Sequence, residues 1–236
     1  MDLYSTKILV TTLTFSIAYI ATVTLSGAFR SWVAGLMGDH TPEYEGFSSL
    51  NPMMHISFLG YLFLVLQSFG WGKHVPINPL NIQGKFRPLK LGVAFFSDTI
   101  LHIIFAIVGL FILIAWFDPM MIRIVNSIIL HKNISHLYIT QYYPMYSSLS
   151  VSIAFILAAW VALNTGLAVL EFLLNTCLLG MHLIMGSSST YMEYSFYFMF
   201  LAPLLLMIFF YGPLLVMITY FITYAGFALA SLAQAI

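Results

Sequence analysis

The sequence predicts an all-α membrane protein whose chain crosses the bilayer about six times. Of its 236 residues, 61% are hydrophobic and only 7% are charged, whereas a soluble domain carries roughly a quarter charged residues. Several apolar runs reach the roughly 20 residues that a helix needs to cross the hydrocarbon core. These runs lack the alternation that is typical of a membrane β-barrel. Lipid is therefore the expected solvent, and helices satisfy the backbone internally.

Hydropathy divides a single membrane domain, residues 1–236, into expected spans and connections. Residues 118–145 are too polar for a comfortable span and are expected to lie in the interface or in a loop. The run that ends at Met185 is interrupted at Asn164, Gly166 and Asn175. The expected spans cover about 5–37, 53–69, 91–117, 145–185, 193–211 and 213–232.

The few charged residues indicate orientation and the kind of partner. Residues 73–90 carry Lys73, Lys85, Arg87 and Lys90 and no acid, so the positive-inside rule places this loop in the cytoplasm. The first connecting segment is then expected on the other face, unless the first apolar run is a broken or re-entrant hairpin. The net charge is zero and no basic cluster follows a nucleic-acid-binding pattern, so no nucleic-acid partner is expected. The expected partners are lipids and other integral membrane proteins.

Two polar blocks interrupt the apolar sequence: GDHTPEYEGFSSLNPMMHISFLG at 38–60 and FGWGKHVPINPLNI at 69–82. Together they resemble the site-2 protease family of intramembrane zinc metalloproteases, in its compact bacterial branch. The likeness covers about residues 25–100 and, more weakly, 164–186. The matching positions, whose implied role is to turn and connect the chain, are Gly38, Asp39, Thr41, Gly46, Leu50, Asn51, Pro52, His55, Ile56, Gly60, Gly70, Trp71, Lys73, Val75, Pro76, Asn78 and Pro79.

The resemblance implies a zinc motif, H-E-x-x-H, on the helix that ends before Gly38. The family spacing places Ser26 and Arg30 at its histidines and Gly27 at its glutamate. A later aspartate ligand corresponds to Leu179. Serine is a poor zinc ligand, glycine has no base, and a guanidinium cannot be deprotonated. These four positions are therefore interpreted as degenerate.

On this basis the sequence predicts a protein that is not an enzyme and needs no cofactor. It would act as an accessory or scaffold subunit of a membrane complex, or as a binder of transmembrane segments, because the family groove admits a substrate helix. The compact branch implies a bacterial inner membrane, with an organellar membrane as the alternative.

Other readings remain open for the polar residues. A zinc site rebuilt from His40, His55 and His182 would keep protease activity, although the plainer role of His55 is a hydrogen bond that holds its loop. Asp98 and His102 lie four residues apart on one helix face. They could form a proton or ion path, or a buried pair that satisfies itself, or Asp98 could cap its helix. Glu171 and His182 share a face and are possible partners of another helix or of Arg30.

Overall fold

The computed structural model describes residues 3–117, 125–126, 147–185 and 189–233, and the elements in this part of the chain are helical. The prediction of an all-α membrane class is confirmed. The helices are α1 (Leu3–Met37), α2 (Thr41–Tyr44), α3 (Pro52–His55), α4 (Phe58–Gln67), α5 (Arg87–Trp116), α8 (Ser148–Met185) and α9 (Ser189–Ala233). An isolated antiparallel bridge joins Ile56 to Gly72.

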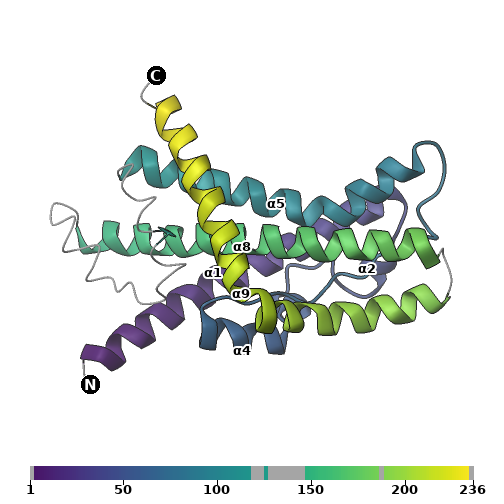
Figure 1. Cartoon of the computed structure of the whole chain (residues 1–236), viewed down its shortest axis with the longest axis horizontal. Coiled ribbons are helices and arrows are strands. Elements are labelled where there is room, and N and C mark those ends of the chain that lie inside the picture. The colour runs from purple at the N-terminus through teal and green to yellow at the C-terminus, as the bar shows by residue number, and fades with distance from the viewer. Residues whose placement is uncertain (1–2, 118–124, 127–146, 186–188, 234–236) are drawn as a thin grey trace.

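Among the described residues, 4 helices are long and apolar enough to cross a membrane, within α1, α5, α8 and α9. The chain is therefore an integral membrane protein, but the six expected spans are not reproduced. Helix α4 replaces the span expected at 53–69; its 10 residues extend only about 15 Å, half of the roughly 30 Å core. The two closing spans form one helix, α9, with Pro203 and Pro213 inside it. Figure 1 shows α9 changing direction partway along.

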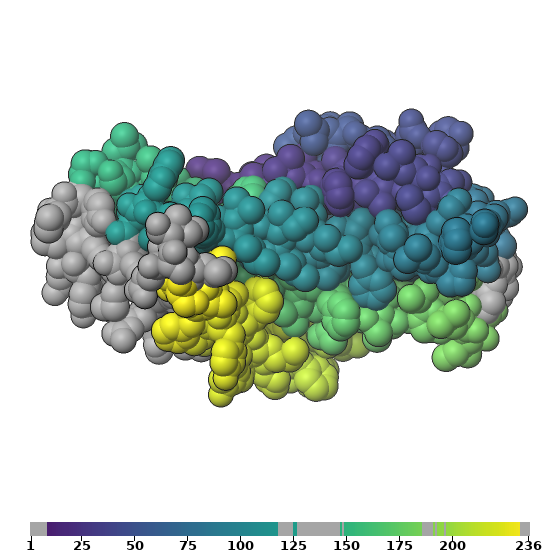
Figure 2. Space-filling model, turned by 90° about the horizontal axis from the view of Figure 1, so that it is seen from above, coloured from purple at the N-terminus to yellow at the C-terminus, as the bar shows by residue number. Residues whose placement is uncertain are grey.

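Helix α8 is the centre of the bundle and packs against α1, α5 and α9 (Figure 1). In its most apolar stretch 72% of the residues are buried, against 22% in α9. Buried side chains of α5 and α8, such as Phe95, Leu110, Phe155 and Leu163, fill the core between them. Seen from above, α5 lies across the face of the molecule in this view, with α1 on one side and the second half of α9 on the other (Figure 2). Helix α9 therefore presents most of its surface to lipid or to a partner.

The connection between α1 and α5 folds back on itself. The buried carboxylate of Asp39 accepts hydrogen bonds from the backbone N–H of Asn78 at 2.7 Å and from the Asn81 side chain at 2.9 Å. Residues 38–41 and 78–81 therefore lie side by side. The expectation that the first connection lies on the face opposite to loop 73–90 is wrong, because α4 is too short to carry the chain across.

The interfacial segment expected at 118–145 falls outside the described residues, except for residues 125–126, which are helical. Val125 is buried, and the Asn126 side chain donates a hydrogen bond to Thr223 on α9 at 2.9 Å. This contact attaches the described part of the segment to the second half of α9.

Candidate functional site

A buried cation joins three membrane helices at the centre of the molecule. Arg30, on α1, is only 1% exposed and forms an ion pair through Nη1 with Asp98 on α5. The same nitrogen donates to the side-chain oxygen of Asn175 on α8 at 3.0 Å. The Asn175 amide in turn donates to Asp98 at 3.1 Å. Each charge thus has a partner, as a charge buried in a membrane requires.

A second carboxylate lies beside this pair. Glu171, one turn before Asn175 on α8, has its Oε2 4.0 Å from Arg30 Nη1. Within the described residues, this oxygen and the Nε and Nη2 atoms of Arg30 are buried without a hydrogen-bond partner. The possible pairing of Glu171 with Arg30 is thus confirmed as proximity, whereas Asp98 makes the direct contact.

Asp98 and His102 do not form a hydrogen bond with each other, because each side chain bonds to another partner. The imidazole of His102 is hydrogen-bonded through Nδ1 to the side-chain oxygen of Asn164 at 2.9 Å. Asn164 donates in turn to Thr22 on α1 at 3.1 Å and to the Trp160 carbonyl at 2.9 Å. A second polar link therefore connects α1, α5 and α8, one level away from the ion pair. Asp98 also accepts from the backbone N–H of Thr99 at 2.7 Å.

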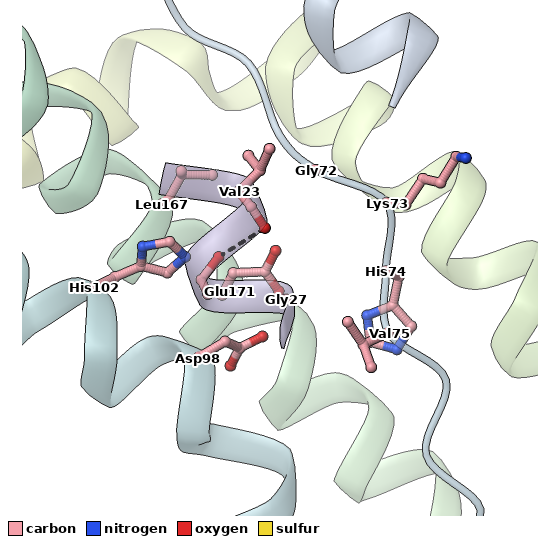
Figure 3. A pocket seen from close by; sticks show the side chains of 11 residues that line it. Val23, Gly27, Gly72, Lys73, His74, Val75, Asp98, His102, Leu167 and Glu171 are labelled. Atoms are coloured by element: carbon pink, nitrogen blue, oxygen red, sulfur yellow. Dashed lines mark hydrogen bonds between the residues drawn. The ribbon is translucent and has the colours of Figure 1, made fainter. Parts of the chain in front are cut away.

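The Arg30–Asp98 ion pair and the His102–Asn164 link lie next to a small cavity of about 20 Å³, which is lined by Asp98, His102 and Glu171 among others. Figure 3 shows the side chains of Asp98, His102 and Glu171 around it, with His74 on the side away from His102. This volume is enough for one water molecule, which needs about 10–15 Å³. His74 lies in the loop between α4 and α5; burial, and then the charge of Arg30, hold the pKa of its imidazole well below the usual value.

The residues at the zinc-motif positions do not fit a zinc ion. The Ser26 hydroxyl bonds to the Val23 carbonyl of its own helix at 3.4 Å. A Cβ atom on Gly27 would come within 2.3 Å of His55 Nδ1, so glycine leaves the space that the imidazole occupies. Arg30 places a fixed cation where a metal ligand would stand. Leu179 packs as an apolar side chain against the core.

The alternative zinc set is not brought together. In the described part of the chain no group of three or more His, Cys, Asp or Glu side chains is placed to hold a metal ion. His40 is exposed and bonds to Glu43 at 2.8 Å. His55 bonds through Nε2 to the Ser49 carbonyl at 2.8 Å, in agreement with the loop-holding role. His182 packs edge-on against Tyr191, with ring centroids 5.3 Å apart.

The matching family positions hold the connection between α1 and α5 together. Gly38 has φ +109, which suits glycine, and the adjacent Asp39 binds the second block through Asn78. Asn51 caps α3, which begins at Pro52, by accepting from Met53 N–H at 3.1 Å. Lys73 reaches the Met53 carbonyl at 3.1 Å. The Pro79 carbonyl accepts from Arg87 at 3.2 Å.

Backbones approach closely where α4 meets the second block. A Cβ atom on Gly60 would lie 1.8 Å from the Trp71 carbonyl oxygen, and one on Gly70 would lie 2.0 Å from the Gly60 oxygen. The Trp71 carbonyl also accepts from the buried Tyr19 hydroxyl at 2.8 Å. These contacts fix α4 against α1 and against the extended residues that follow it.

A second, larger cavity lies on the other side of residues 72–74. Its volume is about 820 Å³, and it shares Gly72, Lys73 and His74 with the small cavity. Its wall is mainly apolar, with Glu45, Lys73, His74 and Tyr191 as the ionisable groups. The apolar side chains come from the α2–α4 region, the extended segment, α5, α8 and α9, and include Phe47, Phe58, Leu59, Trp71, Pro76, Ile77, Phe95, Leu178, Met199 and Phe200.

Sequence reasoning identified Arg30, Asp98 and Glu171 but not the amides that complete the site. Asn164 and Asn175 were read only as interruptions of an apolar run, yet both are 0% exposed and bond to α1 and α5. The available signal was their position inside a membrane helix, where side-chain amides commonly bond across helices.

Comparisons with known proteins agree with the metalloprotease likeness over part of the chain. Over 99 residues the chain is 27% identical to a Bacillus subtilis (strain 168) protein described as "Putative zinc metalloprotease YwhC". The match covers 42% of this chain and 44% of the relative, so the chain spans less than half of the relative's length. No protein-family model and no solved structure matches.

This similarity corrects one prediction. The expectation that the chain is not an enzyme is contradicted, because the relative is described as a zinc metalloprotease and the match therefore indicates a protease. The degenerate reading of Ser26, Gly27, Arg30 and Leu179 stays a prediction. The chain is an integral membrane protein that is similar, over 42% of its length, to a bacterial protein described as "Putative zinc metalloprotease YwhC".

Proposed function

We propose that this site-2-protease-like membrane protein binds transmembrane segments of other integral membrane proteins. The observation that carries the proposal is the cavity of about 820 Å³ between the α2–α4 region and helices α5, α8 and α9. Its size lies within the range of pockets that enclose a ligand, and its wall is mainly apolar. An apolar helix end is the occupant that suits such a wall within a membrane.

The position of the cavity supports the same occupant. Phe95, Leu178 and Met199 belong to helices that are apolar enough to span the membrane, whereas Glu45 and Lys73 belong to the connection between α1 and α5. An incoming segment would therefore place apolar side chains against the helices and its polar end near the two exposed charges. The bacterial similarity favours a bacterial inner membrane as the location.

Site-specific photo-crosslinking in the native membrane tests the proposal. A photoreactive residue at Met199, which lines the cavity and is 8% exposed, should give discrete adducts with membrane proteins. The matched control is Phe209, also on α9 but 70% exposed and outside the cavity. Leu59→Trp adds a larger side chain on the α4 side of the cavity, so it should lower the yield of adducts from Met199. Adducts with lipid alone, or equal adducts from both positions, would contradict the proposal.

A further inference from the structure

The charges around Arg30 do not balance if every group carries its ordinary charge. One guanidinium faces two carboxyl groups, Asp98 and Glu171, and the direct contact goes to Asp98. An isolated charge inside an apolar medium is costly, and a second carboxylate beside the first adds repulsion. The other titratable groups around Glu171 in the small cavity are Lys73, His74 and His102.

None of these groups offers Glu171 a second counter-ion. His102 is turned to Asn164, and the Lys73 ammonium is exposed and bonded to the Met53 carbonyl. His74 is partly buried, and this burial together with the charge of Arg30 lowers the pKa of its imidazole and favours the neutral form. The ionised form of Glu171 would therefore be an uncompensated negative charge, whereas its acid form is neutral.

We propose that Glu171 is a proton-binding site in the membrane, occupied by a proton while Arg30 is paired with Asp98. The cavity beside the carboxyl group has a volume of about 20 Å³, which is room for one water molecule that would carry the proton. Gly72, Lys73 and His74 form a shared wall that separates this small cavity from the larger one.

When Glu171 releases its proton, its carboxylate competes with Asp98 for the guanidinium of Arg30. Its Oε2 lies 4.0 Å from the same Nη1 atom that pairs with Asp98, and Arg30 Nε and Nη2 are available as further donors. The protonated and ionised states of Glu171 therefore favour different partners for Arg30. This inference does not depend on the binding of transmembrane segments.

Labelling with the apolar reagent dicyclohexylcarbodiimide tests whether the proton is present. A protonated carboxyl group adds across one C=N bond: its proton goes to nitrogen and its oxygen to carbon, and the acyl group then migrates to nitrogen with no leaving group. In the full chain in lipid vesicles, mass spectrometry should locate the label on Glu171 and not on Asp98, and labelling should fall as the pH rises. Glu171→Gln should abolish this label, and the exposed control Glu193→Gln should keep it. A label on Asp98 instead would overturn the proposal.

Infrared spectroscopy gives an answer that does not depend on reagent access. The difference spectrum between wild type and Glu171→Gln at neutral pH should contain the C=O stretching band of a protonated carboxylic acid; its absence would overturn the proposal. Asp98→Asn then tests the competition. With Asp98 neutralised, Arg30 needs Glu171 as its counter-ion, so that band and the carbodiimide label should both be lost. A folded Asp98→Asn variant that keeps the band would refute the competition.

Discussion

At the scale of single residues, Arg30 is a buried charge on which the packing of three helices depends. Its side chain is buried where α1, α5 and α8 meet, and it is held by Asp98 and Asn175. A buried ion pair adds little over apolar packing, but removing one partner leaves an uncompensated charge. The intact pair therefore adds little net stability, but the three helices pack well only when both of its charges are present.

Arg30→Ala should lower the free energy of unfolding by about 3–5 kcal/mol, because Asp98 then keeps a buried charge without a cation. Equilibrium unfolding in detergent micelles measures the change. Lys85→Ala is the control: Lys85 is exposed and lies over the Phe86 ring, so its removal should change stability little. Equal stability of both variants would show that Arg30 is not buried as a charge.

His74 predicts how stability depends on pH. Burial and the Arg30 charge lower the pKa of His74 in the folded protein from its ordinary 6.5. The unfolded chain therefore takes up a proton first as the pH falls below about 6.5, and the stability due to neutral His74 is complete above that pH and is lost toward acid. His74→Gln should reduce the acid-side loss in thermal unfolding curves recorded over a pH series. An unchanged pH profile would contradict this assignment.

The sequence was sufficient to single out polar residues in apolar runs but not to pair them. Asp98 and His102 share a helix face, which suggested a mutual contact, yet Asp98 binds Arg30 and His102 binds Asn164. The partners lie 68 and 62 positions apart. Spacing within one helix shows which residues share a face, whereas packing between helices decides which of them meet.

At the scale of elements, α4 depends on glycine. Gly60 lies against the backbone of Trp71, and no side chain there can move aside to admit a Cβ atom. The Tyr19 hydroxyl and the Ile56–Gly72 bridge attach the same extended segment to its neighbours. A shift of α4 would therefore disturb the segment that separates the two cavities.

Gly60→Ala should destabilise the protein by about 1–3 kcal/mol, because overpacking against a rigid backbone forces a shift. Gly180→Ala is the matched control within helix α8, since nothing lies within 4 Å of the added methyl group. That variant should be neutral or gain up to about 1 kcal/mol from helix propensity. Thermal unfolding of the two variants measures the difference, and a neutral Gly60→Ala would contradict the close approach.

Hydropathy identified α1, α5 and α8 well because long apolar runs have few alternatives in lipid. It failed for α4, because the apolar run continues to Phe69 whereas the helix ends at Gln67. Ser68 adopts φ 57 and ends α4 in a left-handed turn. It also failed at Pro213, because a proline inside a membrane helix does not necessarily end it.

At the scale of the whole molecule, the fold fixes which connections share a face of the membrane. Because Asp39 binds Asn78 and Asn81, the segment after α1 and the segment before α5 lie together. Helices α1 and α5 must therefore cross in opposite directions. The positive-inside rule predicts that this shared face, which carries the basic loop at 73–90, is the cytoplasmic one.

Cysteine accessibility tests both statements in one experiment. In a Cys177→Ala background, single cysteines replace Lys85 in the basic loop and Tyr44, which is 86% exposed in the segment after α1. A membrane-impermeant maleimide should label both in inverted bacterial membrane vesicles and neither in intact cells. Labelling of both in intact cells would reverse the orientation but keep the shared face. Labelling of the two from opposite sides would refute the shared face, because the hydrogen bonds of Asp39 cannot span a bilayer.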